Sequence, residues 1–385
     1  MARWPARSDM TQRFVRAAFY RGGTSKGVML HARDCPTDAA QLDNMLLSIL
    51  GSPDPFGRQL DGMGGGSSSL SKAAIIGPPT VPGADIDYTF AQVAVSRPVV
   101  DWGANCGNLS SAVGPFAVDE GLVRVADGTA TVRIHQVNTR KLIHARFAVA
   151  DGIAVIDGDC AIGGVAGTRA PITLDFLDPG ATVTPALLPG GAPLETIDVD
   201  GVSYEVSLVD ASNPVVFVSA ASLGLTGTEL PAAIELRGDV MARLDHIRRV
   251  AGVRMGLGAT PDSVGLANPK IAMIAAPADF TTLSGQVIPA ADYDIGIRIV
   301  SMDRVHNAVT LTGAMCLAVA TCIDGTLAAR FASKERRAQS IRVGNPSGIV
   351  EVGADVASDV DGWHARSASV LRTARLLMRG EVAVR

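Results

Sequence analysis

A cysteine set among glycine and asparagine residues has the chemistry to move a proton. Cys106 lies within the run Asn105-Cys106-Gly107-Asn108, after a strand-like segment at 90–95 and before small apolar residues at helical spacing. This pattern predicts a strand-to-helix junction at the cysteine. The free N–H groups of a helix start bind a carboxylate or phosphate, and the same position favours a thiolate. Cys106 is therefore a candidate acid or base beside an anion site, or else a residue that only fills a tight helix start.

Lys72 is the second residue that could take part in such a transfer. It follows a flexible segment rich in glycine and serine at 61–71 and directly precedes the apolar, strand-like run at 73–76. Most lysines are solvated, so a surface position is the plain alternative. The strand that follows at once favours partial burial, and burial favours the neutral amine. A neutral lysine near a dry pocket can take a proton from carbon.

A glycine loop at 21–27 offers hydroxyl, amine and backbone N–H groups through its Gly-Gly-Thr-Ser-Lys sequence. A nucleotide-binding P-loop needs GxxxxGK[ST] at the start of a helix, whereas residues 28–30 continue here as a strand. The sequence therefore argues against a P-loop. Two interpretations are left, a hairpin turn and an anion-binding loop.

Composition is typical of a globular protein with neither a nucleic-acid nor a membrane partner. Of the 385 residues, 47% are hydrophobic and 19% charged, the net charge is −4, and no apolar run has membrane-spanning length. The first residues lack the apolar segment of a secretory signal, and no basic cluster suggests nucleic acid. Five scattered cysteines without a CxxC pair indicate neither a disulfide framework nor a zinc site. We therefore predict a cytoplasmic protein that needs no metal or other cofactor.

The order of the elements that must position these residues predicts an α/β fold with two similar halves. Forty-one glycines and 4% aromatic residues favour a sheet-rich architecture over a helical bundle. A strand-like run at 308–312 precedes a small-residue helix start, a weak echo of the stretch around Cys106. We predict an N-terminal domain over 12–200 and a C-terminal domain over 201–365, each with a sheet wrapped around one central helix. The tail, roughly 366–385, is left free to pack back on the first domain.

Nine short motifs occur in a characteristic order across nearly the whole chain. They lie at residues 21–27, 51–54, 61–65, 71–72, 105–108, 254–256, 269–272, 312–314 and 346–348. In combination they resemble the PrpF family, which includes 2-methylaconitate cis-trans isomerase, methylitaconate isomerase and 4-oxalomesaconate tautomerase. The resemblance implies the two-domain fold of diaminopimelate epimerase, with the active site in the interdomain cleft.

The resemblance also implies roles for individual residues. Lys72 and Cys106 are implied as the acid–base pair of a cofactor-independent enzyme. Epimerases of this fold use two facing cysteines, but this chain has Thr310 where the second would stand, and Cys316 falls beyond the motif. A two-thiol racemase is therefore disfavoured. The candidate substrate-binding residues are Gly23, Thr24, Ser25, Lys26, Ser68, Ser69, Ser71, Asn105, Gly107, Asn108, Lys270, Thr312, Gly313, Ser347 and Gly348.

The preferred function is isomerisation of an unsaturated di- or tricarboxylate, most like that of a 2-methylaconitate (aconitate-type) cis-trans isomerase. Removing a proton from a methylene conjugated with the double bond gives a dienolate-like anion. Rotation of this anion gives cis-trans exchange, whereas reprotonation at the distant carbon gives an allylic shift, as in a 4-oxalomesaconate tautomerase. Asn345 stands where the family usually has histidine, so the substrate could differ. A non-catalytic anion-binding protein is the alternative from another class, and whether the protein forms a homo-oligomer is left open.

Overall fold

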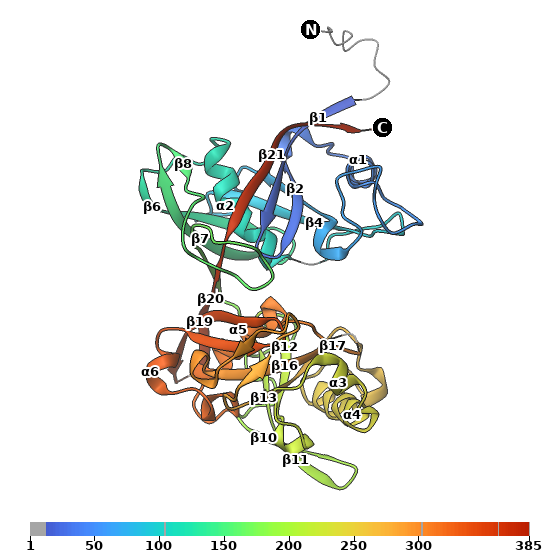
Figure 1. Ribbon diagram of the computed structural model, residues 1–385, viewed down its shortest axis with the longest axis vertical. Helices are drawn as coiled ribbons and strands as arrows, with labels where there is room; N and C mark the ends of the chain where they lie inside the picture. Colours follow the sequence, from blue (N-terminus) through green and yellow to red (C-terminus); the bar gives the residue numbers. More distant parts are fainter. Residues whose placement is uncertain (1–12, 104, 302, 361, 385) are drawn as a thin grey trace. The chain divides into compact units, whose positions relative to one another are not determined.

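The computed structural model describes residues 13–103, 105–301, 303–360 and 362–384, which form two compact units (Figure 1). Unit 1 comprises the residues up to Leu174 and those from Arg372 onward, and unit 2 runs from Asp175 to Leu371. The predicted division at 200/201 differs from this one. The reason is that β10 (Glu195–Val199) forms a hairpin with β11 (Val202–Asp210) and so belongs with the second unit.

Unit 1 is a mixed sheet that surrounds helix α2 (Gly107–Asp119) (Figure 1). Strand β1 (Arg13–Gly22) pairs antiparallel with β21 (Ala374–Val384) along its whole length, although the two lie far apart in the sequence. Strand β3 (Lys72–Gly77) lies parallel to β2 (Ser25–His31). Strand β9 (Ile172–Leu177) spans the point where the chain passes into unit 2. The other strands of unit 1 are β4 (Ile86–Val93), β5 (Val100–Asp101), β6 (Gly128–Gln136), β7 (Lys141–Ala150) and β8 (Ile153–Ala154).

Helix α2 is rich in small residues and is buried inside this sheet over most of its length. Ala112, Val113 and Ala117 are fully buried. At Gly114 an added Cβ would lie 2.7 Å from a ring carbon of Phe147 and 3.0 Å from Ala145 Cβ, both on β7. Close approach of helix and sheet therefore requires glycine there, which explains the run of small residues after Cys106.

Helix α1 (Ala39–Leu50) covers the other face of the unit 1 sheet. Ala73 and Ile75 of β3 pack in one apolar cluster with α1 and with Val28 and Leu30 of β2. Side chains alternate along a strand, so the even-numbered residues of β3 and the odd-numbered residues of β2 face α2. This alternation decides which candidate residues can lie near the start of α2.

Unit 2 repeats the arrangement around helix α5 (Leu311–Cys322), which is buried over nearly its whole length. Helices α3 (Pro231–Glu235) and α4 (Gly238–Arg254) cover the other face of its sheet. The predicted α/β fold of two halves, each with a sheet around a central helix, is thereby confirmed. Besides β10 and β11, the strands are β12 (Pro214–Ser219), β13 (Lys270–Ala275), β14 (Phe280–Thr281), β15 (Val287–Ile288), β16 (Ile295–Ser301), β17 (Arg304–Val305), β18 (Ile341–Asn345), β19 (Gly348–Asp359) and β20 (Gly362–Arg372); α6 (Lys334–Arg337) is a short surface helix.

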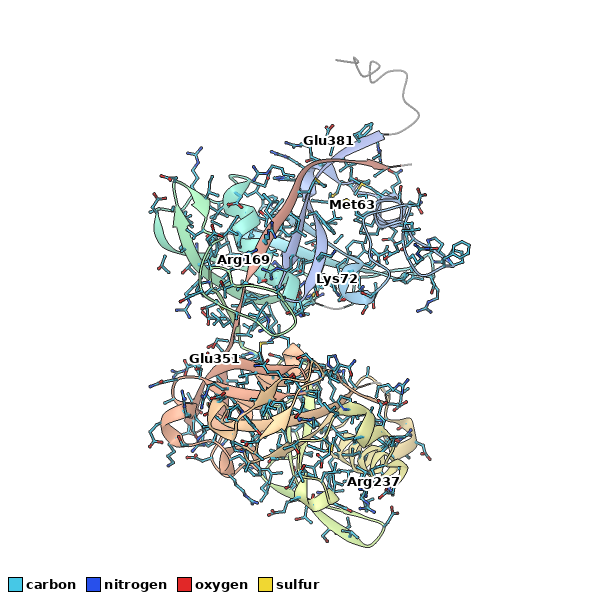
Figure 2. All side chains as sticks on the ribbon, viewed as in Figure 1. Met63, Lys72, Arg169, Arg237, Glu351 and Glu381 are labelled. Carbon is cyan, nitrogen blue, oxygen red and sulfur yellow. The ribbon has the colours of Figure 1, made fainter. Side chains whose placement is uncertain are left out.

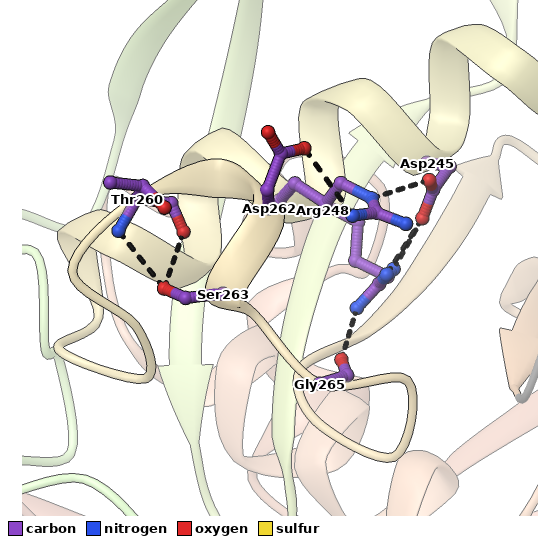
Figure 3. A network of polar contacts seen from close by, with 7 residues as sticks. Asp245, Arg248, Thr260, Asp262, Ser263 and Gly265 are labelled. Atoms are coloured by element: carbon purple, nitrogen blue, oxygen red, sulfur yellow. Dashed lines mark hydrogen bonds and ion pairs between the residues drawn. The ribbon is translucent and has the colours of Figure 1, made fainter.

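A buried arginine ties α4 to the loop that follows it. Arg248 is buried and donates two hydrogen bonds to Asp245 Oδ1, at 3.0 and 2.7 Å, and one to Gly265 O at 2.7 Å (Figure 3). Burial by itself raises the pKa of Asp245, but the hydrogen bonds from Arg248 and Arg249 outweigh it and lower that pKa. This polar cluster is therefore saturated by internal contacts.

In the described part of the chain, no helix is both long enough and apolar enough to span a membrane.

Candidate active site

Cys106 is the N-cap residue of α2, at the predicted strand-to-helix junction. Its Sγ accepts a hydrogen bond from the Leu109 N–H at 3.4 Å, and its thiol points toward Ser25 Oγ at 3.8 Å. The cysteine is half-buried, whereas Ser25 is buried. A thiol in this position lies at the positive end of the helix dipole, and because it is only half-buried a small molecule can reach it.

Asn108, in the first turn of α2, joins the helix to two distant segments. Its Nδ2 donates to Thr24 Oγ1 at 3.1 Å, and its Oδ1 accepts from Arg372 Nε at 3.0 Å. At Gly23, where φ is +53°, a Cβ would lie 2.3 Å from Asn108 Oδ1, so only glycine fits the turn. Burial lowers the pKa of the Arg372 guanidinium to about 10, and the charge of Cys160 opposes that shift. Asn108 thus works as an internal link as well as a candidate ligand group.

Lys72 begins β3 and faces α2, with only 8% of its surface exposed (labelled in Figure 2). Its Nζ donates to Gln92 Oε1 at 2.5 Å and lies 5.1 Å from the centre of the Phe90 ring. At Gly27 an added Cβ would lie 2.9 Å from both a Leu109 methyl group and the Lys72 carbonyl oxygen. The start of β3 is therefore next to the first turn of α2. Lys72 and Ser25 lie on the face of the sheet that packs on α2, the helix that Cys106 caps.

The serine-rich segment is a short turn, η3 (Ser68–Leu70), whose backbone rather than side chains contacts the site. The carbonyl oxygens of Ser68 and Ser71 both accept from Gln92 Nε2, at 3.1 and 2.9 Å. Ser71 is fully buried, and its hydroxyl accepts from Gln59 Nε2 at 2.7 Å. Ser69 Oγ lies 3.1 Å from Ser67 Oγ. Of the three candidate serines, only Ser68 and Ser69 have exposed surface to offer a substrate.

Lys26 is separated from the other candidates of its loop. It alternates with Ser25 along β2, and its Nζ lies 5.8 Å from the centre of the Phe19 ring, on the face that α1 covers. The structure therefore does not bring Lys26 to Cys106. The alternation of side chains along β2 places Lys26 and Ser25 on opposite faces of the sheet. The sequence alone does not say which of these faces packs on α2 and so lies near Cys106.

In unit 2, Thr310 holds the position in α5 that Cys106 holds in α2. It is the N-cap residue, and its Oγ1 accepts from the Gly313 N–H at 3.1 Å. A Cβ at Gly313 would lie 2.6 Å from that hydroxyl oxygen. Cys316 is fully buried within the helix, donates to Val209 O at 3.5 Å, and has a thiol pKa raised by burial. Cys316 therefore points into the core, as the sequence predicted.

The remaining candidates of unit 2 surround the start of α5 or the β18–β19 turn. Lys270 faces α5, because Ile271 beside it packs with α4; its Nζ donates to Ala267 O at 3.2 Å, and burial lowers its pKa. Ser347 Oγ donates to Asn307 O at 2.6 Å, and Gly348 begins β19 with φ of +126°. Thr312 lies in the first turn of α5. In unit 1, Asn105 and Gly107 directly precede and follow Cys106, the N-cap residue of α2.

Sequence reasoning missed three residues of the unit 1 site: Gln92, Arg372 and Tyr88. Gln92 is recognisable only from the β3–β4 register, which sets it opposite Lys72. Arg372 comes after all of unit 2 in the sequence, so no local pattern connects it with Asn108, which it contacts. Tyr88 is fully buried on β4, and its pKa is raised by burial and by the nearby charge of Cys106. Within the described residues, no three His, Cys, Asp or Glu side chains gather as metal ligands would.

Comparison with known proteins agrees with this architecture over its full length. The family model described as PrpF protein matches residues 12–385. The 3-methylitaconate isomerase of Eubacterium barkeri is 39% identical over 368 residues, which cover 94% of this chain and 95% of the relative. The 2-methyl-aconitate isomerase of Cupriavidus necator is 39% identical over 386 residues, covering 96% and 97%. The crystal structure of methylitaconate-delta-isomerase superposes with a TM-score of 0.90 at 38% identity, covering 97% of this chain and 96% of that one. The chain therefore belongs to the PrpF family.

Proposed function

We propose that this protein isomerises an unsaturated di- or tricarboxylate by moving a proton between Lys72, the substrate carbon and Cys106. Relatives at 39% identity are named as isomerases of such acids, which supports the reaction class. The observation that carries the mechanism is the placement of a buried amine and a half-buried thiol on the α2 face of one sheet. Simple binding of an anion needs no such titratable pair.

In the proposed reaction, neutral Lys72 removes a proton from a methylene group that is conjugated with the substrate double bond. The C–H electron pair spreads into the double bond and the adjoining carboxylate, so that the fixed double bond is lost. In this proposal, the N–H groups at the start of α2 and the Ser25 and Thr24 hydroxyls stabilise the developing negative charge; their position around Cys106 and Asn108 supports this role. Reprotonation of the carbon, with Cys106 as the acid, gives the product and leaves a Cys106 thiolate and a Lys72 ammonium. Transfer of one proton from Lys72 to Cys106, through substrate or solvent, restores the starting state.

Two products can follow from the same anion. Rotation before reprotonation at the original carbon gives cis-trans exchange, and we favour this outcome for an aconitate-type substrate. Reprotonation at the distant carbon gives an allylic shift, and the methylitaconate isomerase relative, which is equally similar, supports this second candidate. We propose further carboxylate-binding groups in unit 2. They are Thr312 and Gly313 at the start of α5, Lys270, and Ser347 and Gly348 in the β18–β19 turn. A cytoplasmic location stays a prediction.

Proton NMR in D₂O tests the proposed function directly. The wild-type protein is incubated with aconitate, 2-methylaconitate, methylitaconate and saturated tricarballylate as a control. We expect deuterium to enter the methylene or methyl position of at least one unsaturated acid, together with the appearance of its isomer. Tricarballylate should exchange nothing, because its anion has no double bond to delocalise into. Absence of exchange and isomerisation across the unsaturated acids would contradict the proposal.

Activity is expected to survive exhaustive chelation. The proposed acid–base groups are an amine and a thiol, and the surrounding donors are hydroxyls and amides, a poor set for a divalent metal. We expect the same turnover before and after dialysis against EDTA, measured by NMR on the active substrate. Loss of activity that a divalent metal alone restores would contradict this prediction.

A further inference from the structure

We propose that Gln92 is a positioning residue that holds the Lys72 amine in place and aims its lone pair. This inference rests on the proposed function, in which Lys72 is the base. Gln92 lies on β4 directly opposite Lys72 in the antiparallel β3–β4 pair, so both side chains project from the α2 face of the sheet. Its Oε1 accepts from Lys72 Nζ at 2.5 Å.

The Gln92 amide has only one orientation that satisfies its neighbours. Its Nε2 donates to the carbonyl oxygens of Ser68 and Ser71, at 3.1 and 2.9 Å, and a carbonyl can only accept. A flipped amide would set an oxygen against two oxygens. The Oε1 atom is thereby committed to Lys72, and the amine must be the donor in that contact.

This commitment has a consequence for base catalysis. A neutral amine that gives one N–H to Gln92 Oε1 directs its lone pair away from Gln92, into one of the two remaining staggered positions on Nζ. The carbonyl holds the amine without adding a negative charge, whereas a carboxylate in the same place would stabilise the ammonium form. No carboxylate among the described residues forms an ion pair with Lys72. An amide therefore suits a lysine that must lose its proton.

Few other titratable groups face this amine. Tyr88 is on the same face of β4, and its raised pKa keeps it neutral in the physiological range. Cys106 begins α2, which packs on this face, and Asp101 of β5 lies opposite Gln92 with its Oδ1 accepting from the Gly103 N–H at 2.8 Å. A pH titration of Lys72 must therefore be read with Cys106 and Asp101 as neighbours.

Gln59 supplies a matched control. It is also buried and supports the same loop, because its Nε2 donates to Ser52 Oγ and Ser71 Oγ and its Oε1 accepts from the Gly66 N–H. It has no hydrogen bond to Lys72. Substituting Gln59 therefore loosens the loop while leaving the Lys72–Gln92 contact in place.

The kinetic test compares Gln92→Met, Gln92→Glu and Gln59→Met. For Gln92→Met we expect kcat to fall on the order of tenfold to a hundredfold through misplacement of the base, with KM within about twofold. For Gln92→Glu we expect the rise of kcat with pH to move to higher pH, because a base beside a carboxylate loses its proton later. Gln59→Met should unfold at a lower temperature and keep the wild-type pH profile. If both glutamine sites gave the same loss with no change in profile, the role of Gln92 would be structural only and the proposal would be overturned.

A second measurement reads the inference without any substrate. The chain has only five lysines (26, 72, 141, 270 and 334), so selective ¹³C-lysine labelling followed by NMR of the Cε signals follows their titrations without altering the amines, and Lys72→Met assigns the Lys72 signal. We expect the Lys72 signal to titrate at higher pH in Gln92→Glu than in the wild type and to be unchanged in Gln59→Met. An unchanged Lys72 titration in folded Gln92→Glu would overturn the proposal. Failure of the proposed function would instead appear as a wild type that exchanges no deuterium.

Discussion

Replacement of Cys106 by serine is expected to lower the isomerisation rate by on the order of a hundredfold or more, the usual contribution of a general acid or base. Serine is a good N-cap residue, so the hydroxyl can still accept from the Leu109 N–H and α2 should persist. The proton donor, however, becomes a far weaker acid. Steady-state kinetics with circular dichroism of the folded protein measures both effects.

The other cysteines provide the controls for this result. Cys35 donates to His31 O at 3.4 Å, and burial raises its pKa to about 11; Cys316 is buried and donates to Val209 O. A serine hydroxyl can make the same donations, so Cys35→Ser and Cys316→Ser should keep near-normal turnover. A folded Cys316→Ser protein as inactive as Cys106→Ser would reinstate a two-thiol mechanism.

Lys72→Met is expected to abolish deuterium exchange, with a rate loss on the order of a hundredfold to ten-thousandfold. Methionine keeps much of the lysine stem and removes the amine, which contacts Gln92 and lies over the Phe90 ring. Substrate binding, measured by calorimetry, should therefore persist while the methylene proton stays in place. Binding without exchange is the pattern that identifies the missing base.

Two other lysines separate a general charge effect from base catalysis. Lys270→Met should mainly weaken binding, as expected for a proposed carboxylate partner. Lys26→Met should change little, because Lys26 lies beside Phe19 on the face away from α2. If Lys72→Met exchanged deuterium at the wild-type rate, the base would be Cys106 alone or another group.

The parts of the site that the sequence could predict are those set by local pattern. Small residues after Cys106 predicted a buried helix, and its N-cap position follows from the glycine and asparagine around it. The apolar run after Lys72 predicted a core strand beside the lysine. The echo at 308–312 predicted a second buried helix start, but the strand expected there is wrong, because Thr310 is the N-cap residue and α5 begins at Leu311. Each of these depends on a few consecutive residues.

The parts that escaped prediction depend on pairing between distant segments. Gln92 becomes a partner of Lys72 only through the register of β3 and β4, and Arg372 reaches Asn108 only because β21 returns to β1. The different fates of Lys26 and Ser25 depend on which face of β2 meets α2. The predicted boundary at 200/201 differs from the unit boundary at 174/175, because β10 pairs with β11 across the predicted point and so belongs to unit 2.

The pairing of β1 with β21 also sets an order for the protein's assembly on the ribosome. The register runs from Arg13 opposite Val384 to Gly22 opposite Ala374, so β1 can form this pairing only after β21 has been synthesised. All residues of unit 2 have been synthesised by Leu371, before the strand that completes unit 1 exists. Unit 1 therefore gains strand β21 and the Asn108–Arg372 contact only after all of unit 2 has been synthesised.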